Sequence, residues 1–425
     1  MNRVLLSLLV ALLVNVNLLS QNFKKDQETF LEAEYFLMFE DYIDALPIYL
    51  SLYKNYPDNY NIAYRIGLCY LGITDQKHLS IDYLEKAALN SEASYREGSL
   101  RQEKAPYTAW YYLGNAYRIN YQFQKAKEAY KKYLETLMQG DIDNIRFIEH
   151  QINICDNARN LMDNPVTFEE ENIGENFNDG YNNFNPVISS DGLRFAYMSS
   201  LKFYDAIFFS TKEKNRWSKP VNITPELESD GDHYISCLAD DGNTLYMSKD
   251  DDVESDIYLS RYDGTKWSAA ERLPDIINTG YWESHAFVTD DGSTMVFSSD
   301  RPGGMGGLDL YISYKNNMGE WGQPVNLGPE INTPFNEDRA FLIDNGNKIF
   351  FCSQGHYNMG GFDLFRSEKA QGDNWSKPEN LGYPLNTSDD DIFFMPVDNG
   401  NSGYIPLHRK GKGYGKEDIY LIKFK

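Results

Sequence analysis

The stretch Asp291–Tyr311, which reads DGSTMVFSSDRPGGMGGLDLY, decides the fold of the C-terminal half of the chain. It begins with the turn dipeptide Asp291-Gly292, continues as an apolar strand and a Gly-rich loop, and ends with Asp309 opening an aromatic strand. Asp-Gly favours the positive φ of a tight hairpin turn. Short apolar and aromatic runs bounded by Gly and Asp are typical of antiparallel strands. The stretch therefore predicts one repeating unit of β-sheet.

This unit occurs five times, at intervals of 50 to 54 residues. Its turn dipeptides are Asp191-Gly192, Asp241-Gly242, Asp291-Gly292, Asn345-Gly346 and Asn399-Gly400. Each unit then has an Asp before an aromatic strand, at Asp205, Asp256, Asp309, Asp363 and Asp418. Four units add a tryptophan, at Trp217, Trp267, Trp321 and Trp375, which we assign to an outer strand. Four strands per roughly 50 residues make one propeller blade. Residues 165–425 are therefore predicted to form a five-bladed β-propeller.

The fifth unit has no tryptophan strand, and the chain given ends at Lys425, just after the third strand of that unit. Residues 171–178, which read ENIGENFN, resemble the segments that link one blade to the next, although no blade precedes them. We therefore expect residues 166–172 to supply the outer strand of the fifth blade. Such closure protects sheet edges that otherwise favour aggregation.

Residues 21–164 have helical periodicity and a different repeat. Ala33 and Gly67 are 34 residues apart, which is the period of tetratricopeptide (TPR) helical hairpins, and residues 110–117 match the pattern W-x2-L-G-x2-Y. The predicted fold class is thus α+β multidomain, an α-solenoid of TPR hairpins followed by the propeller. Arrays of this kind present a concave face to partners. We expect that face to show Tyr64, Tyr111, Asn115 and Arg118; the alternative is that these residues are solvated or packed.

Residues 1–20 predict a signal peptide, since Arg3 precedes an apolar run and Ser20 suits cleavage before Gln21. The apolar run is shorter than the ~20 residues that span a bilayer, and no later segment is apolar enough. The net charge of −23 excludes a nucleic-acid partner, because phosphates would repel the chain. The four cysteines do not form a disulfide framework. Buried free thiols are expected, with a Cys69–Cys155 bridge as the alternative.

Acidic residues recur near the start of the innermost strand of several blades. They are Asp232, Glu283, Glu337 and Asp391, with His233 and His285 beside them. Residues at these positions are expected to gather around one mouth of the central channel. Carboxylates there could hold Ca²⁺ through oxygen ligands, or an Arg or Lys of a partner; the alternative is that each caps nearby backbone N–H groups and faces water.

The sequence gives no sign of an active site. The six histidines lack metal-ligand spacing, and no G-x-S-x-G nucleophile elbow occurs. The Gly-rich loop at 300–307 is followed by a strand rather than a helix, so it does not predict a phosphate cradle. We therefore predict a non-catalytic protein without a cofactor, apart from the Ca²⁺ ion considered above.

The unit at 291–311 resembles the WD-like propeller repeat of TolB and many bacterial periplasmic proteins. A TPR array followed by this propeller is similar to the N-terminal portion of Bacteroidota periplasmic proteins related to PorE. The resemblance implies a periplasmic protein associated with the outer membrane and with type IX secretion. Those proteins continue into an OmpA-like peptidoglycan-binding domain, which has no counterpart in the sequence given.

Together these features predict an envelope scaffold that binds protein partners of a secretion or outer-membrane machine through the propeller mouth and the TPR groove. Two alternatives remain. One is a glycan- or peptidoglycan-binding module that uses exposed aromatic side chains. The other is a propeller-type glycoside hydrolase, for which Glu283 and Glu337 are the candidate carboxylates.

Overall fold

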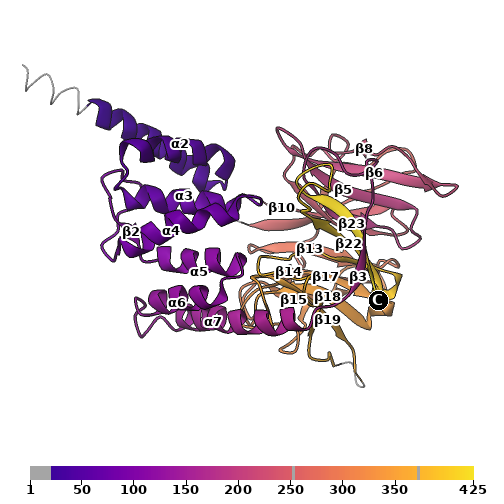
Figure 1. Ribbon diagram of the computed structural model, residues 1–425. Helices are drawn as coiled ribbons and strands as arrows, with labels where there is room; N and C mark the ends of the chain where they lie inside the picture. The colour runs from indigo at the N-terminus through magenta and orange to yellow at the C-terminus, as the bar shows by residue number, and fades with distance from the viewer. Residues whose placement is uncertain (1–20, 251–253, 371–373) are drawn as a thin grey trace, which may run out of the picture. The chain divides into compact units, whose positions relative to one another are not determined.

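The computed structural model describes residues 21–250, 254–370 and 374–425, so the predicted signal peptide lies outside the described residues. The chain divides into two compact units, Met1–Asp156 and Asn157–Lys425. Seven α-helices among the described residues precede five β-sheets arranged as propeller blades, as Figure 1 shows. The predicted fold class is therefore confirmed: helices are followed by a five-bladed β-propeller.

The helices follow one another along the chain as neighbouring pairs. They cover residues 21–38, α2 (Tyr42–Asn55), α3 (Tyr60–Gly72), the 3-10 helix η1 (Lys77–Leu79), α4 (Ser80–Leu89), α5 (Ala109–Ile119), α6 (Phe123–Leu134) and α7 (Ile142–Asp163). A two-residue parallel pairing of β1 (Ser91–Glu92) with β2 (Ala105–Pro106) closes the segment between α4 and α5. In Figure 1 helices α2 to α7 form one stack, which is the arrangement that a helical repeat produces.

Two glycines lie where paired helices cross. Gly67 of α3 lies against the side chain of Leu84 in α4, and Gly114 of α5 lies against the ring of Tyr130 in α6. A Cβ atom at either glycine would overlap that neighbour. Leu84 and Tyr130 are both fully buried. The small residues that defined the repeat in the sequence therefore permit close packing of the helices.

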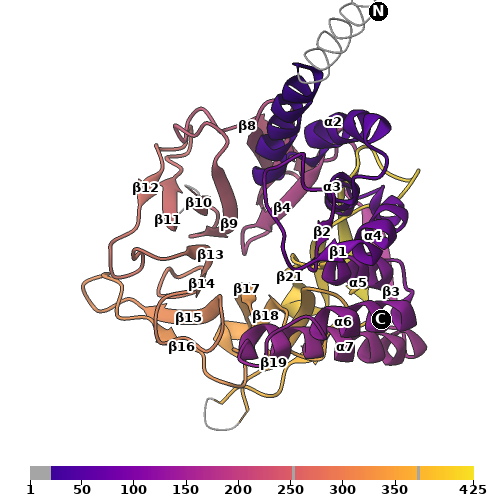
Figure 2. The same ribbon diagram turned by 90° about the vertical axis from the view of Figure 1, so that its left-hand side faces the viewer.

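Each propeller blade is an antiparallel sheet in which the chain runs from the innermost strand outward. Blade one consists of β4 (Asn183–Ile188), β5 (Arg194–Ser200), β6 (Asp205–Glu213), β7 (Arg216–Trp217) and β8 (Val221–Asn222). Blade two consists of β9 (His233–Ala239), β10 (Thr244–Asp250), β11 (Ser255–Arg261) and β12 (Glu271–Arg272). Blade three consists of β13 (Glu283–Val288), β14 (Thr294–Ser299), β15 (Asp309–Tyr314) and β16 (Val325–Asn326). Figure 2 shows β4, β9 and β13 around a common axis.

The last two blades complete the ring. Blade four consists of β17 (Glu337–Ile343), β18 (Lys348–Ser353), β19 (Asp363–Glu368) and β20 (Glu379–Asn380), with the turn η2 (Asp344–Gly346). Blade five consists of β21 (Met395–Val397), β22 (Ser402–Leu407), β23 (Asp418–Phe424) and β3 (Phe168–Asn172), with the turn η3 (Asp398–Gly400). The strand β3 pairs antiparallel with β23, from Phe168 opposite Phe424 to Asn172 opposite Tyr420. A segment that precedes blade one thus supplies the outermost strand of blade five, where the sequence analysis placed residues 166–172.

The tryptophans do not form the outer strands that we expected of them. Trp267, Trp321 and Trp375 each make a single β-bridge, and the short outer strands β12, β16 and β20 follow a few residues later. Only Trp217 lies in a strand, the two-residue β7. Each indole ring packs instead between neighbouring blades. For example, Trp267 of blade two meets Phe209 of blade one edge-to-face, with ring centroids 5.1 Å apart.

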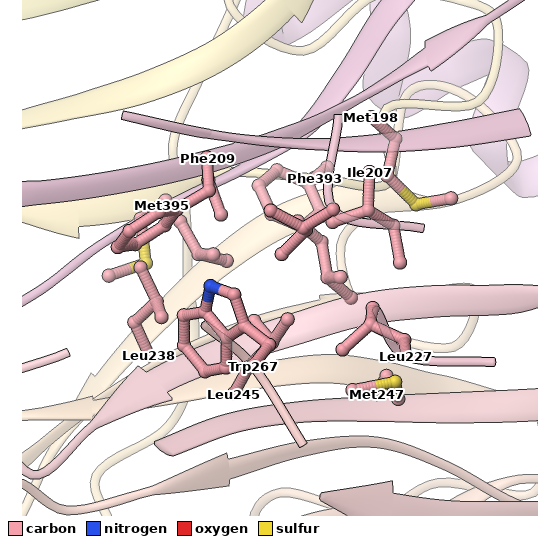
Figure 3. Packing of buried hydrophobic residues seen from close by; sticks show 14 of the residues in the cluster. Met198, Ile207, Phe209, Leu227, Leu238, Leu245, Met247, Trp267, Phe393 and Met395 are labelled. Carbon is pink, nitrogen blue, oxygen red and sulfur yellow. The ribbon is translucent and has the colours of Figure 1, made fainter. Parts of the chain in front are cut away.

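Hydrophobic clusters between neighbouring blades form the core of the propeller. Figure 3 shows the cluster between blades one and two, in which Met198, Ile207 and Phe209 pack with Leu245, Met247 and Trp267. Phe393 and Met395 of blade five also reach this cluster. A second cluster lies between blades four and five, and the partly buried Phe168 and Phe424 pack against it. Because each blade buries its faces against its neighbours, the ring is stabilised as a whole.

We predict that Gly114→Val destabilises the helical unit by about 1–3 kcal/mol, the usual cost of overpacking a filled core. The added side chain would overlap the ring of Tyr130, which is fully buried. Thermal unfolding followed by circular dichroism at 222 nm measures the effect. Gly140→Val is the matched control, because a Cβ atom at Gly140 meets nothing within 4 Å. Equal stability losses in the two variants would contradict the packing role of Gly114.

Candidate functional site

Three of the four carboxylates predicted at the channel mouth, Glu283, Glu337 and Asp391, brace the turns between blades. In each blade a polar side chain near the start of the innermost strand bonds to the residue four positions earlier. These pairs are Asp179–Asn183, Ser229–His233, Thr279–Glu283, Thr333–Glu337 and Thr387–Asp391. Each of these side chains thus makes at least one hydrogen bond within its own turn. The capping alternative describes these residues, except that Glu283 and Glu337 are buried rather than facing water.

Glu283 and Glu337 have nearly the same surroundings. Glu283 accepts hydrogen bonds from the backbone N–H of Thr279 at 2.6 Å, from Ser299 Oγ at 2.7 Å and from Arg301 Nη2 at 3.1 Å. Glu337 accepts from Thr333 N–H at 2.7 Å and from Ser353 Oγ at 2.6 Å. Both carboxylates are 0% exposed. Neither can reach a bound substrate in this arrangement, so the acid–base roles considered for them in a hydrolase have no geometric support.

Asp232 does not occupy the repeated position, which in blade two belongs to His233. Asp232 Oδ1 lies 2.7 Å from His233 Nδ1, and Asp232 Oδ2 accepts from Lys249 Nζ at 2.6 Å. Burial alone would raise the pKa of Asp232, but the hydrogen bond from Lys249 and the neighbouring His233 lower it to about 2. Burial also lowers the pKa of His233. Asp232 is therefore a charged partner within blade two. It lies one residue before the position that Glu283, Glu337 and Asp391 occupy in their blades.

His285 belongs to a different set of residues, at bulges of the innermost strands. The pairing register shifts at Asn185, His285 and Arg339, each two residues after the brace position, and all three have positive φ, between 47° and 54°. His285 Nδ1 lies 3.5 Å from Asp338 Oδ1, and neither ring nitrogen has a hydrogen-bond partner among the described residues. Burial, together with the nearby charge of Arg339, lowers the pKa of His285 to about 4. The ring is therefore neutral at pH 7.

The predicted carboxylates are not gathered into a cation site. Across the described ranges of the chain, no group of three or more His, Cys, Asp or Glu side chains is arranged to hold a metal ion. Asp391 accepts from Thr387 N–H at 2.5 Å. Its burial, together with the nearby charge of Asp363, holds the pKa of its carboxyl well above the usual range. A raised pKa opposes the charged form that Ca²⁺ requires.

The four residues expected on the concave face of the helices make contacts inside the helical unit. Tyr64 and Arg118 are buried, at 8% and 5% exposure, and Tyr64 OH lies 3.2 Å from Thr108 Oγ1. Arg118 Nε donates to the hydroxyl of Tyr130, which in turn donates to Asn115 Oδ1. Tyr111 packs against Tyr112, Tyr130, Tyr133 and Phe147. These side chains hold neighbouring helices together; Tyr64 and Arg118 are enclosed, whereas Tyr111 and Asn115 remain partly exposed.

None of the four cysteines forms a disulfide bond, and all four thiols are buried. Cys69, Cys155, Cys237 and Cys352 are all free and buried, so the Cys69–Cys155 bridge is absent. Burial raises the pKa of all four thiols. Among the helices of the described residues, none combines the length and the apolar character needed to cross a bilayer.

Aromatic side chains fill the middle of the propeller channel. Phe287 of β13, Phe341 of β17 and Phe393, just before β21, meet edge-to-face, with ring centroids 5.7 and 5.5 Å apart. Phe287 and Phe341 line a cavity of about 670 Å³ at the end where the first and second strands of the blades turn. Phe393 lines a cavity of about 350 Å³ at the end where the innermost strands begin. The channel therefore has two separate mouths.

The first cavity defines the turn mouth, which has an apolar floor and an acidic rim. Leu238, Phe287, Phe341 and Met395 form the floor. The rim includes Asp290, Asp291, Asp344 and Asp398 from the turns of blades three, four and five. Asp344 and Asp398 are exposed and have φ values of 53° and 50°, since they belong to the η2 and η3 turns. The Asp-Gly and Asn-Gly turns that predicted the fold thus also place carboxylates around this mouth.

The second cavity defines the entry mouth, and of the residues predicted at the channel mouth Asp391 lines it. Its other polar groups come from Asn185, Tyr234, Arg339, Asp390 and Glu417. The signal in the sequence for two of these is a polar residue two positions after the brace, as in Asn183-Phe-Asn185 and Glu337-Asp-Arg339. In a regular strand such residues would share a face with the brace. The bulge changes the alternation of side chains between the two faces of the strand, and the sequence pattern does not predict the bulge.

No protein-family model matches the chain, and no curated protein matches it. Among solved structures it is similar to TolB from Acinetobacter baumannii, at 16% identity and a TM-score of 0.37, over 58% of this chain and 56% of that one. It is also similar to a putative TolB from Agrobacterium tumefaciens (16%, TM-score 0.36, 58% and 78%) and to an alpha-L-arabinofuranosidase from Lactobacillus brevis (13%, 0.39, 58% and 91%). The chain thus spans little more than half of the A. baumannii TolB. The blade count rests on the strand pairing of this chain itself.

We predict that Glu337→Gln removes a pH-dependent loss of stability. Burial raises the pKa of Glu337 from 4.5 to about 7, so between these pH values the folded protein binds a proton that the unfolded chain has released. Stability of the wild type therefore falls as pH rises through this window. Since one pKa unit corresponds to about 1.4 kcal/mol, the variant should gain about 1–3 kcal/mol on the wild type between pH 5 and pH 8.

Urea unfolding followed by tryptophan fluorescence measures this difference, because all tryptophans except Trp110 lie in the propeller half. Asp344→Asn, at an exposed carboxylate, is the control and should track the wild type at both pH values. A Glu337→Gln variant whose stability differs from wild type by the same amount at pH 5 and pH 8 would exclude a buried carboxyl that titrates.

Proposed function

We propose that this chain is a non-catalytic scaffold of the bacterial envelope, which binds a protein partner at the turn mouth of its propeller. The observation that supports this most directly is the cavity of about 670 Å³, whose apolar floor is contributed by several blades and whose rim carries aspartates. An apolar pocket surrounded by a charged rim is the usual anatomy of a protein-binding site. The envelope location rests on the signal peptide predicted at residues 1–20.

The chemistry of the turn mouth favours a partner segment with an apolar side chain flanked by Lys or Arg. The apolar side chain would fill the space above Phe287, Phe341 and Met395. Basic neighbours would face the rim carboxylates, and the net charge of −23 would speed their approach. Such rim charges contribute more to association rate and specificity than to affinity.

A second contact surface is offered by the helical unit. Leu31, Tyr35, Met38 and Phe39 expose 48%, 59%, 69% and 49% of their surface, and their spacing places them on one side of the helix over residues 21–38. This stripe is a part of the helical unit that a partner can reach, whereas Tyr64 and Arg118 are buried. A role within type IX secretion or another outer-membrane machine remains part of the proposal, and rests on the resemblance of the repeats.

Site-specific photocrosslinking tests the turn mouth. A benzophenone amino acid at Asn345, an exposed residue of the η2 turn, should yield discrete crosslinked proteins in intact cells. The same amino acid at Lys410, exposed in the connection between β22 and β23 at the other end of the propeller, should not yield those species. Identical products from both positions, or none from Asn345, would refute binding at the turn mouth.

We further predict that Asp344→Asn combined with Asp398→Asn reduces the Asn345 crosslinks several-fold, and more at low than at high salt. Both positions have positive φ, which Asn adopts readily, so the fold should be unaffected. Thermal unfolding verifies the fold. Undiminished crosslinking by the double variant would show that the rim charges play no part in binding.

A further inference from the structure

The entry mouth has features that protein binding at the turn mouth does not explain. Its cavity of about 350 Å³ falls within the range of small-ligand pockets, about 300–1,000 Å³. Polar groups of four blades line it, namely Asn185 of blade one, Tyr234 of blade two, Arg339 of blade four and Asp390 of blade five. The rings of Phe184 and Phe393 add apolar surface, and the remaining lining residues are Asp391, Ile392, Ile405, Pro406 and Glu417. Polar groups that converge from several blades around apolar surface are typical of a ligand site.

The backbone at this mouth has the same irregular conformation at equivalent positions. Asn185, His285 and Arg339 have φ values of 47°, 47° and 54°, in the left-handed region, which Asn and His adopt more readily than Arg does. All three lie at bulges of innermost strands. Bulges redirect side chains and are over-represented next to functional sites. A bulge with positive φ that is repeated in three blades at one end of a channel therefore points to a site there.

Arg339 has unused hydrogen-bonding capacity. Its Nη1 donates to Asn185 Oδ1 at 3.3 Å, whereas its buried Nε has no hydrogen-bond partner in the described part of the chain. The distance from Nε to Asp338 Oδ2 is 3.8 Å, too long for a hydrogen bond. Within the described ranges, Asn185 Nδ2 contacts Met198 Sδ, a weak acceptor, at 3.8 Å. Since buried polar groups are normally satisfied, these donors favour a ligand that supplies acceptors.

The charges around Arg339 restrict the class of ligand. Asp338 and Asp250 both interact with this guanidinium, and Asp390, Asp391 and Glu417 line the same cavity. A free anion would be repelled by these carboxylates, and a cation that entered the cavity would lie beside the positive charge of Arg339. A neutral ligand with several hydroxyl groups avoids both penalties, because each hydroxyl both donates and accepts. Hydroxyls can therefore accept from Arg339 and Asn185 and donate to Asp390.

Exposed aromatic side chains surround this end of the propeller. Tyr181 and Tyr281 precede the innermost strands of blades one and three, Phe203 and Tyr204 lie between β5 and β6, and Tyr414 lies between β22 and β23. Their exposed fractions are 45%, 45%, 84%, 37% and 51%. These segments share the end that holds the entry mouth, since Tyr234 donates to Asp205 beside Tyr204, and Glu417, close to Tyr414, lines the cavity. Flat amphipathic rings on an exposed surface suit the apolar faces of sugars.

We propose that the entry mouth binds a neutral glycan. One sugar unit occupies the cavity, with its hydroxyls bonded to Arg339, Asn185 and Asp390 and its apolar face against Phe184 and Phe393. Neighbouring units of the chain stack on exposed rings such as Phe203 and Tyr414. The edge-to-face contacts among Phe287, Phe341 and Phe393 separate this site from the turn mouth. The proposal therefore stands independently of the protein partner.

Saturation-transfer NMR with the full mature chain tests this directly. The neutral probes are the methyl glycosides of glucose, galactose, N-acetylglucosamine, xylose and arabinose, with cellobiose and chitobiose as disaccharides. Sodium phosphate, sodium acetate and ethylamine are the charged probes. We expect saturation of at least one neutral glycoside, undiminished by an equal concentration of any charged probe. Saturation of none, or displacement by a charged probe, would overturn the proposal.

Variants locate the site. Arg339→Gln should weaken binding of the bound glycoside at least ten-fold, and Phe203→Ala with Tyr414→Ala should weaken binding of a disaccharide more than that of its single unit. Asn345→Ala at the turn mouth is the matched control and should bind as wild type. If Arg339→Gln lowers the melting temperature, Asp390→Asn, at an exposed carboxylate of the same cavity, replaces it. Binding that survives both substitutions would place the sugar elsewhere and refute this site.

Discussion

The closure of the ring depends on a buried asparagine, and blades two, three and four are tied in the same way to the connections that follow them, whereas in blade one Thr224 takes this place. In blade three, Asn332 accepts from Leu310 N–H at 2.8 Å and donates to Leu310 O and to Asn326 Oδ1, while Asn326 donates to Asp309. Asn386 does the same in blade four. Asn178 repeats it with Ile419 and Asn172, although these residues lie at opposite ends of the propeller sequence. Removing such a side chain would leave buried backbone groups unsatisfied, at about 1–3 kcal/mol each.

This network explains why the segment around residue 172 resembles the links between blades. The links that follow blades three and four carry two asparagines six residues apart, and Asn172 with Asn178 has that spacing. Asn172 Nδ2 donates to Asp418 Oδ2 at 2.8 Å, as Asn380 donates to Asp363 at 2.7 Å. The aspartates that open the third strands are thus structural. They also hold the loops before them, since Asp418 accepts from the N–H groups of Tyr414 and Gly415.

The fold could be predicted from the sequence because the turn residues and the buried residues recur in each blade. Asp-Gly and Asn-Gly turns, the third-strand aspartates and the glycines at 67 and 114 each act through close neighbours in their own repeat, so spacing alone located them. The candidate site was harder to predict from the sequence for the same reason. Glu283 and Glu337 recur because they brace turns, and a recurring carboxylate looks alike whether it braces a turn or binds a ligand. Arg339 reaches the channel through a bulge, which depends on pairing with β18 rather than on sequence spacing.

The repeat and the functional surfaces therefore use different residues. Positions that are alike in every blade are used within the fold: the braces bond their own turns, and the asparagines bond the next connection. The bulge positions of the innermost strands differ between blades, because Asn185, His285 and Arg339 occupy equivalent bulges with different chemistry. A closed ring of five similar sheets has little need for three different polar side chains at one repeated position. Their divergence is the strongest physical argument for a ligand at the entry mouth.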